Sequence, residues 1–120
     1  MMMKVYVYSK CSTCQKALSF LAKNNVSFVR KEITDEPPSI QELQAMLRHV
    51  NGNIKKLFNS SGQLYRDMNM AEKIKDLPQP DALALLSQHG MLIKRPFLIG
   101  ENSGLVGFNE AEWASLLNSG

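Results

Sequence analysis

Two cysteines, Cys11 and Cys14, are the residues of this sequence best suited to chemistry, and they lie three positions apart. An alternating apolar segment, residues 5–8, precedes them, and apolar residues at helical spacing follow. This order predicts Cys11 in a turn and Cys14 in the first helical turn, where free backbone N–H groups and the helix dipole favour a thiolate. The second thiol could attack a mixed disulfide formed on the first. The pattern therefore indicates thiol–disulfide or reductive thiol chemistry.

Two less reactive roles for the cysteines stay open from the residues alone. A zinc site usually needs four ligands, and the other strong candidates, His49 and His89, lie far apart and outside ligand spacing. We therefore expect no metal site. Inert packing of both thiols in the core is the other alternative. A strand followed by a helix around Cys-x-x-Cys is typical of redox motifs, and this context favours the reactive interpretation.

Length and composition predict one soluble domain, residues 1–120, because the chain is long enough for a core and its 44% hydrophobic content is ordinary. The net charge of +3 comes from scattered lysines and arginines, so we expect no direct nucleic-acid binding. No apolar run approaches the roughly 20 residues that span a bilayer. The start lacks a signal-peptide layout, and the two close cysteines favour a reducing compartment, so we expect a cytoplasmic protein with no membrane contact.

The first third of the chain predicts a β-α-β unit. Residues 3–9 indicate a buried strand, and a helix follows to about residue 23, capped by Ser12 or Thr13. Residues 26–33 alternate well enough for a second strand. Because such crossovers are almost always right-handed and join parallel strands, the two strands are expected side by side.

Helices alone are expected over about residues 39–90, beginning with the capping-box spacing of Ser39 and Glu42. The remaining predicted elements are a strand at 97–99, a returning strand at 105–108 and a helix capped by Asn109. The order predicts an α/β fold. We expect a thioredoxin-like four-stranded mixed sheet flanked by helices, with an all-helical insertion between the β-α-β and β-β-α halves.

With this order, the sequence resembles the arsenate reductase-like (ArsC/Spx) family of thioredoxin-fold proteins over nearly its whole length. Each segment alone is weakly specific, but the four occur in the family's order around the helical insertion. The segments that carry the resemblance are residues 8–17, 57–66, 92–97 and 105–110.

The resemblance implies roles for residues around the cysteines. Cys11 would be the nucleophile, attacking an oxyanion held by arginines that include Arg95, whose charge would also stabilise the thiolate. Pro96 would be the proline that thioredoxin-like folds place, usually in cis, opposite the active-site loop. Backbone N–H groups of Ser12 and Thr13 could cradle the oxyanion, or these residues could only cap the helix. The plain alternatives are a solvated Arg95 and a strand-edge Pro96.

The sequence departs from the family's three-arginine oxyanion clamp at two positions. Asn59 and Gly107 stand where the resemblance places arginines, and we treat Asn59 as a substrate-binding candidate. An amide or a glycine cannot replace the charge-assisted fork of a guanidinium. Lys10 and Lys94 could supply positive charge, but each ammonium is a point charge without the fork geometry of a guanidinium.

Taken together, these features predict a thiol-dependent reductase with Cys11 as nucleophile and Cys14 as possible resolving thiol. The expected substrate is a small oxyanion or a disulfide; no cofactor is expected to be bound, and glutathione or a thioredoxin- or glutaredoxin-type protein would be the reductant. The alternative implied by the resemblance is an Spx-type redox-sensing transcriptional regulator that binds the C-terminal domain of the RNA polymerase α subunit. Gly52 matches a glycine at that regulator's polymerase-binding surface, whereas Ser61 replaces a basic residue there. A third possibility is a module that has lost activity.

Overall fold

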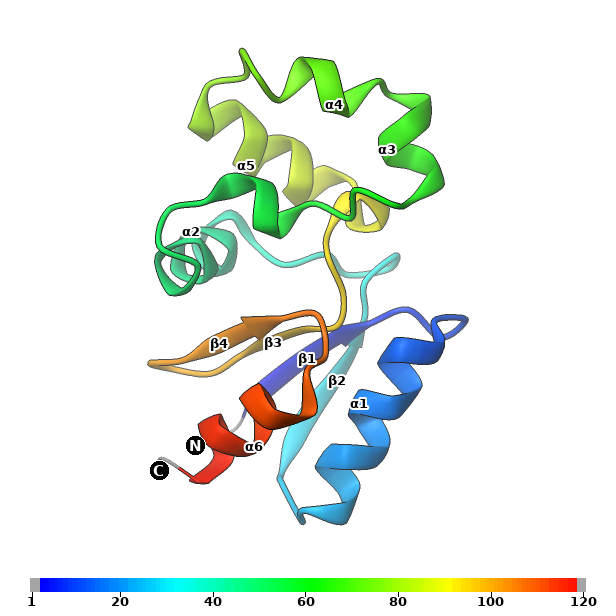
Figure 1. The fold of residues 1–120 in the computed structure, drawn as a ribbon, viewed down its shortest axis with the longest axis vertical. Coiled ribbons are helices and arrows are strands. Elements are labelled where there is room, and N and C mark those ends of the chain that lie inside the picture. The colour runs from blue at the N-terminus through cyan, green and yellow to red at the C-terminus, as the bar shows by residue number, and fades with distance from the viewer. Residues whose placement is uncertain (1–2, 119–120) are drawn as a thin grey trace.

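The computed structural model describes residues 3–118. A four-stranded sheet lies at its centre, with the strand order β2-β1-β3-β4 (Figure 1). The strands are β1 (Met3–Val7), β2 (Phe28–Glu32), β3 (Phe97–Ile99) and β4 (Gly104–Val106). β1 pairs with β2 in parallel, whereas the β1–β3 and β3–β4 pairs are antiparallel. The predicted mixed sheet is therefore confirmed.

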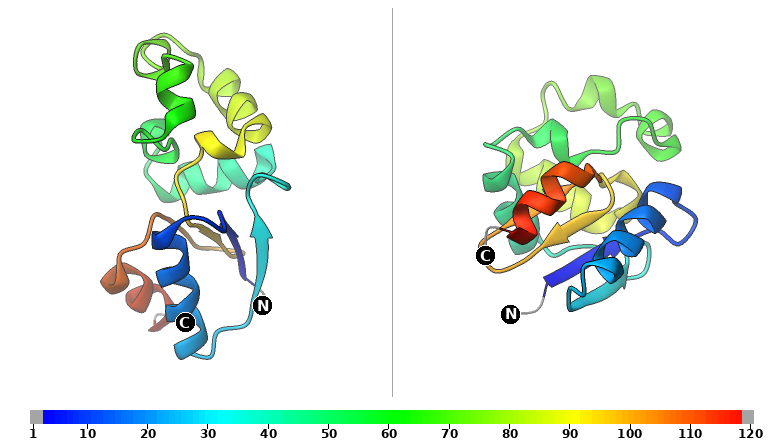
Figure 2. Two further views of the ribbon diagram at one scale, coloured as in Figure 1. Left: turned by 90° about the vertical axis from the view of Figure 1, so that its right-hand side faces the viewer. Right: turned by 60° about the horizontal axis from the view of Figure 1, so that its bottom comes forward.

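Helices cover both faces of the sheet. α1 (Ser12–Lys23) and the final helix α6 (Glu110–Asn118) lie on one face, and the helices between β2 and β3 lie on the other (Figures 1 and 2). The predicted helical insertion is seen as four helices and two 3₁₀ turns: α2 (Ile40–His49), a turn at Ile54–Leu57, α3 (Gln63–Asp67), α4 (Met70–Lys73), α5 (Gln79–Gln88) and a turn at Gly90–Leu92.

Alternation along β1 supplies a core on each face of the sheet. Val5 and Val7 pack with α1 and the fully buried Trp113 of α6, whereas Tyr6 packs with Phe97 beneath the helical insertion. Such opposite-facing neighbours follow from the two-residue period of a strand. β1 is therefore held firmly from both sides, and the turn that follows it is anchored at the edge of two cores.

A polar contact also ties the sheet to α2. The Tyr6 hydroxyl donates to Glu42 Oε1 at 2.6 Å, and Lys4 Nζ lies 3.0 Å from Glu42 Oε2. Glu42 completes the predicted capping box, because its N–H donates to Ser39 Oγ and its carboxylate accepts from the Ser39 N–H, each at 3.1 Å. Burial opposes the charge of Glu42, but the hydrogen bonds from Tyr6, Ser39 and Lys4 outweigh it and lower the pKa of this carboxyl.

Several predicted boundaries are wrong by one or two residues, for local reasons. β1 ends at Val7, and beyond it the Ser9 N–H turns to the Glu32 carboxylate at 2.8 and 3.1 Å instead of joining the ladder. β4 ends at Val106 because Gly107 takes a φ of +72°, which is incompatible with an extended strand. No helix in the described range is both long and apolar enough to cross a membrane.

Candidate active site

The turn between β1 and α1 holds Cys11 as the N-cap residue of the helix. Its backbone is extended (φ −98°, ψ 117°), and its Sγ accepts the Cys14 N–H at 3.4 Å. The Cys11 N–H donates to the Tyr8 carbonyl at 3.0 Å, which closes the turn. The sequence-based cap assignment to Ser12 or Thr13 is therefore wrong: the Cys11 sulfur takes the place that a Ser or Thr oxygen usually takes at an N-cap.

This position makes Cys11 more acidic than an ordinary thiol. Its partial burial opposes ionisation, but the hydrogen bonds from the Cys14 thiol and N–H, the Arg95 charge and the Thr13 N–H outweigh burial and lower the pKa of Cys11. Hydrogen bonds and positive charge act in the same direction here because both stabilise the anion. Cys11 is half-buried, so its sulfur remains open to a substrate.

Cys14 has the opposite character. It is fully buried and packs with Ala17 and Leu21 of α1 against the sheet. Burial is the main cause that raises the pKa of Cys14 to about 12, and the hydrogen bond and charge of Cys11 raise it further. Both cysteines are free thiols in this structure. Two thiols three residues apart therefore divide into one that ionises readily and one that stays protonated.

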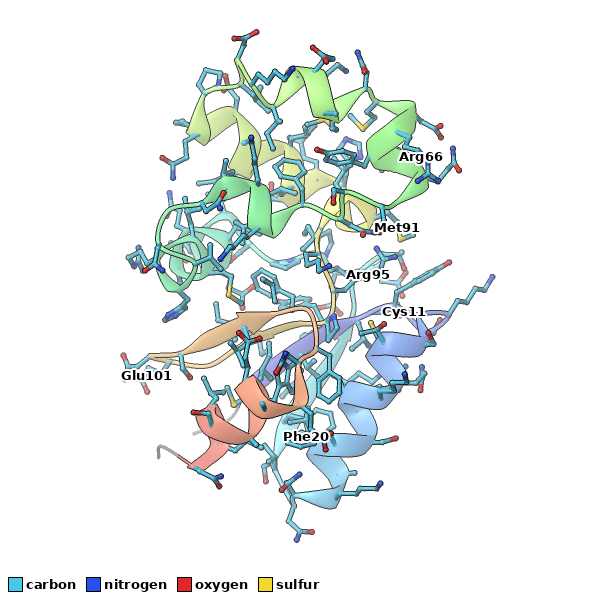
Figure 3. The ribbon with its side chains drawn as sticks, viewed as in Figure 1. Cys11, Phe20, Arg66, Met91, Arg95 and Glu101 are labelled. Carbon is cyan, nitrogen blue, oxygen red and sulfur yellow. The ribbon has the colours of Figure 1, made fainter. Side chains whose placement is uncertain are left out.

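Arg95 is held beside the cysteine turn by the neighbouring loop. Its Cζ lies 5.1 Å from the centroid of the Tyr8 ring, a cation–π distance. Nη1 lies 3.5 Å from the Met91 carbonyl oxygen and 3.8 Å from the Met91 sulfur (Figure 3). The Arg95–Pro96 peptide bond is cis, as the resemblance implied, and Pro96 is buried where β3 begins. Within residues 3–118, the buried Arg95 Nε has no hydrogen-bond partner.

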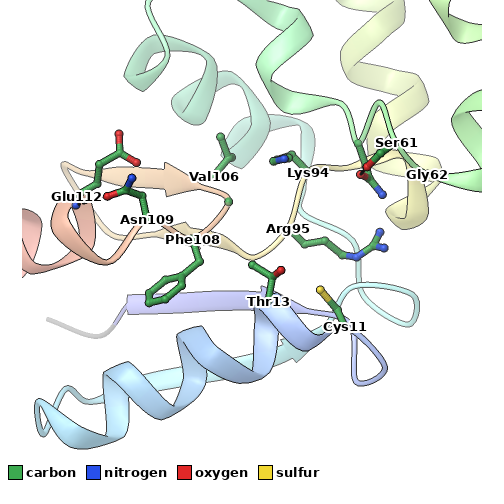
Figure 4. Close-up of a pocket in the computed structure, with 12 residues that line it drawn as sticks. Cys11, Thr13, Ser61, Gly62, Lys94, Arg95, Val106, Phe108, Asn109 and Glu112 are labelled. Carbon is green, nitrogen blue, oxygen red and sulfur yellow. Dashed lines mark hydrogen bonds between the residues drawn. The ribbon is translucent and has the colours of Figure 1, made fainter.

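A cavity of about 540 Å³ opens next to Cys11 (Figure 4). Four segments line it: the start of α1, the loop before α3, the residues before cis-Pro96, and the segment from the end of β4 into α6. The lining residues are Cys11, Thr13, Asn59, Ser61, Gly62, Lys94, Arg95, Val106, Gly107, Phe108, Asn109 and Glu112.

The predicted site residues divide between this cavity and its surroundings. Cys11, Thr13, Asn59 and Arg95 line the cavity, so segments far apart in the sequence meet there. Ser12 is exposed, and neither it nor the buried Cys14 and Pro96 are among the lining residues. These three positions shape the cysteine turn and its support, whereas the four lining residues can contact a bound molecule.

The sequence interpretation missed several lining residues on the β4–α6 side. Asn109 was assigned only as a helix cap, and it does cap α6, since its Oδ1 accepts the Glu112 N–H at 3.0 Å. The same strand-to-helix junction brings Phe108 and Glu112 to the cavity. Tyr8 was missed as the partner of Arg95, and no spacing in the sequence signals that contact. Among the described residues, no group of three or more His, Cys, Asp or Glu side chains could hold a metal ion.

The sheet order, together with a helix capped by a cysteine and a cis-proline directly before β3, defines a thiol protein of the thioredoxin-like fold. Within that class the chain belongs to the ArsC family, whose model matches residues 6–116.

Relatives of known sequence support this assignment. An uncharacterised protein of Bacillus subtilis, YusI, is 37% identical over 113 residues, covering 94% of this chain and 96% of YusI. The global transcriptional regulator Spx of Enterococcus faecalis is 31% identical over 111 residues, covering 92% of this chain and 83% of Spx. The chain is thus similar both to an uncharacterised protein and to a transcriptional regulator.

Solved structures agree with the fold. An ArsC family related protein from Bacteroides fragilis superimposes with a TM-score of 0.90 at 36% identity, covering 97% of this chain and 98% of its own. A possible arsenate reductase from Streptococcus mutans gives a TM-score of 0.86 at 33% identity, covering 94% and 98%. These similarities confirm the predicted thioredoxin-like α/β architecture.

Proposed function

We propose that this protein is a thiol-dependent reductase in which the Cys11 thiolate attacks a small disulfide. The observation that carries the proposal is the placement of the Cys11 sulfur. It accepts a hydrogen bond from the N-terminus of α1 and lines a cavity of about 540 Å³ that Arg95 also lines. A thiolate in such a place is a nucleophile, and the open cavity admits a partner for it.

The reaction balances in two exchanges followed by reduction. The Cys11 thiolate attacks one sulfur of the disulfide, that S–S bond breaks, and the first thiol leaves as a thiolate that takes up a proton. Cys14 then loses its proton and attacks the Cys11 sulfur, so that the Cys11–Cys14 disulfide forms and the second thiol leaves with a proton. Two glutathione molecules, or a thioredoxin- or glutaredoxin-type dithiol, reduce the bridge and restore both thiols.

The order of the two exchanges follows from how the thiols are coupled. After burial, the Cys11 hydrogen bond and charge are causes that raise the pKa of Cys14. Both act only while Cys11 carries its negative charge. Once Cys11 is in a mixed disulfide that charge is gone, so the Cys14 thiol ionises more easily when it is needed as the attacking group. The Cys14 backbone nitrogen lies 3.4 Å from Cys11 Sγ, so the two residues already lie within one helical turn of each other.

The cavity supports a disulfide substrate better than arsenate. Of the positions that the resemblance assigns to arginines, Arg95 alone carries a guanidinium, while Asn59 and Gly107 line the same cavity without charge. Arsenate carries several negative oxygens and depends on charge-assisted hydrogen bonds. A disulfide needs only an accessible thiolate and room for its substituents.

The test is turnover of 2-hydroxyethyl disulfide with glutathione or thioredoxin as reductant, beside arsenate under the same conditions. Wild type is expected to reduce the disulfide, Cys11→Ser to be inactive, and Cys14→Ser to accumulate a mixed disulfide on Cys11 that mass spectrometry detects. Unchanged turnover in Cys11→Ser would refute the nucleophile assignment. Arsenate reduction exceeding disulfide reduction would refute the substrate preference.

The similarity to Spx supports a second candidate function, a redox-sensing regulator that binds the C-terminal domain of the RNA polymerase α subunit. Gly52 is compatible with such contact because it is exposed. Its φ of +78° and its N–H bond to the Leu47 carbonyl (2.8 Å) also serve to end α2 without any partner. A pull-down with the α C-terminal domain, in oxidised and reduced protein, separates the two: redox-dependent binding without turnover would favour the regulator.

A further inference from the structure

We propose that Lys94 recognises a carboxylate on the disulfide substrate, several bonds away from the sulfur that Cys11 attacks. The inference rests on the proposed function and narrows its substrate class to disulfides of small, acidic thiols. Lys94 would act as a specificity-determining residue and take no part in the sulfur exchange itself.

The backbone fixes where the Lys94 side chain starts, and Gly107 makes room for it. The Lys94 N–H donates to the Leu57 carbonyl at 2.8 Å, and the side chain is exposed at the cavity wall. Lys94 Cε lies 3.2 Å from the place where a Cβ at position 107 would stand, and nothing else lies within 4 Å of that place. The missing side chain at Gly107 therefore leaves space that the lysine stem occupies.

Arg95 and Lys94, the two cations that line the cavity, extend toward different ends of it. In Figure 4 the Arg95 side chain extends over the cysteine turn, whereas Lys94 extends toward Val106 and away from Arg95. The Arg95 charge is among the causes of the lowered pKa of Cys11. The ammonium of Lys94 is thus available to a part of the substrate remote from the reacting sulfur.

No protein group neutralises this ammonium in the part of the chain that the structure describes. No ion pair within 4.0 Å involves Lys94, although Glu112 lines the same cavity on the α6 side. The same lining holds neutral side chains that can donate hydrogen bonds to a carboxylate, namely the amides of Asn59 and Asn109. The lining therefore combines two cations, Lys94 and Arg95, with uncharged donors and the carboxylate of Glu112.

The cavity is larger than a sulfur atom and its nearest carbons would fill. At about 540 Å³ it lies within the roughly 300–1,000 Å³ of small-molecule sites. A group bonded to Cys11 would occupy the end near Arg95, and the remaining space leads to Lys94. A short chain that ends in a carboxylate would join the two ends.

The test compares three disulfides of similar size: 3,3′-dithiodipropionate, which is anionic, 2-hydroxyethyl disulfide, which is neutral, and cystamine, which is cationic. The measurement is the second-order rate constant of Cys11 modification in wild type, Lys94→Gln and Lys10→Gln. Lys10 is the matched control, because it is exposed, precedes Cys11 and is not a lining residue of the cavity. Lys94→Gln is expected to lower the anionic-to-neutral rate ratio about two- to fivefold, the range of an exposed ion pair.

The control and the neutral disulfide separate the possible failures. If Lys10→Gln lowers the ratio as much as Lys94→Gln, general charge steering explains the preference and the inference is wrong while the reductase proposal stands. The same conclusion follows if the ratio does not change in Lys94→Gln. If Cys11 reacts with none of the three disulfides at a rate above that of a free thiol, the proposed function itself fails.

Discussion

Gly107 and Gly52 offer a matched pair of substitutions that tests how the cavity wall is built. Both have a positive φ, +72° and +78°, a region that L-residues adopt at a cost of about 1–2 kcal/mol. Hydrogen bonds hold the backbone of both glycines in this conformation. The Gly107 N–H donates to Pro96 O at 2.8 Å and its carbonyl accepts the Trp113 Nε1–H at 3.0 Å, while the Gly52 N–H is bonded to Leu47 O.

The two sites differ in what an added Cβ would meet. At Gly52 nothing lies within 4 Å, whereas at Gly107 the Lys94 Cε lies at 3.2 Å. That carbon is near the end of a flexible, exposed side chain, so it can move by a few tenths of an ångström at little cost. We therefore expect Gly107→Ala and Gly52→Ala each to lower the free energy of unfolding by about 1–2 kcal/mol, with similar values.

Thermal unfolding followed by circular dichroism measures this difference. An unfolding entropy of roughly 2.1 cal/mol/K per residue, over 120 residues, gives about 0.25 kcal/mol/K. Each kcal/mol then lowers Tm by about 4 °C, so both variants should unfold about 4–8 °C below wild type. Gly107→Ala, and not Gly52→Ala, should also reduce the preference for anionic disulfides. A much larger loss of stability in Gly107→Ala would show that Lys94 cannot move aside, and an unchanged Tm in both would refute the backbone argument.

Four further predictions concern the thiols and the contact between the sheet and α2. Arg95→Met should raise the pKa of Cys11, seen as a shift to higher pH in the rate of alkylation by iodoacetamide, because a charge that favours the thiolate is removed. Tyr6→Phe should destabilise the fold by about 1.5–3 kcal/mol in urea unfolding, since it removes a partly buried hydrogen bond to a charged group; a smaller loss in a Glu42→Gln background would confirm that the two side chains act together. Because the pKa of Glu42 is lowered from 4.5 in the fold, its contribution is complete above that value and is lost as pH falls through the lower folded pKa, so Glu42→Gln should flatten the acid limb of the stability profile. Cys14→Ser should leave Cys11 alkylation fast but stop oxidation at a mixed disulfide on Cys11, and a wild type that also stops there without a Cys11–Cys14 bridge would contradict the pairing.

The order of elements was accessible from the sequence because each one carries its own local signal. The capping box of Ser39 and Glu42 and the Asn109 cap are short-range patterns, and the structure confirms both. Apolar spacing was enough to separate the strands from the helical insertion. Boundaries failed where a long-range contact replaced a local one, as when Glu32 took the Ser9 N–H that would have extended β1.

The candidate site was only partly accessible for the same reason. Cys11 and Arg95 could be found from a motif and a family pattern, and the structure brings both to one cavity. The Tyr8 ring beneath Arg95 and the space between Gly107 and Lys94 depend on tertiary packing between segments far apart in the chain. Neither residue type nor spacing reports such contacts, so no reading of a single sequence could have supplied them.

The different acidity of the two thiols follows mainly from the geometry of α1, to which the charge of Arg95 adds by lowering the pKa of Cys11. Position 11 is the N-cap, outside the first helical turn, where its sulfur meets free N–H groups and the cavity. Position 14 lies on the helix face that continues through Ala17 and Leu21 into the core, so burial keeps its thiol protonated. Because an α-helix turns by about 100° per residue, moving the second cysteine to position 15 or 16, both exposed, would take it out of the core. Its pKa would then fall toward the ordinary value. The Cys-x-x-Cys spacing therefore places one thiol at the cavity and the other, protonated, in the core.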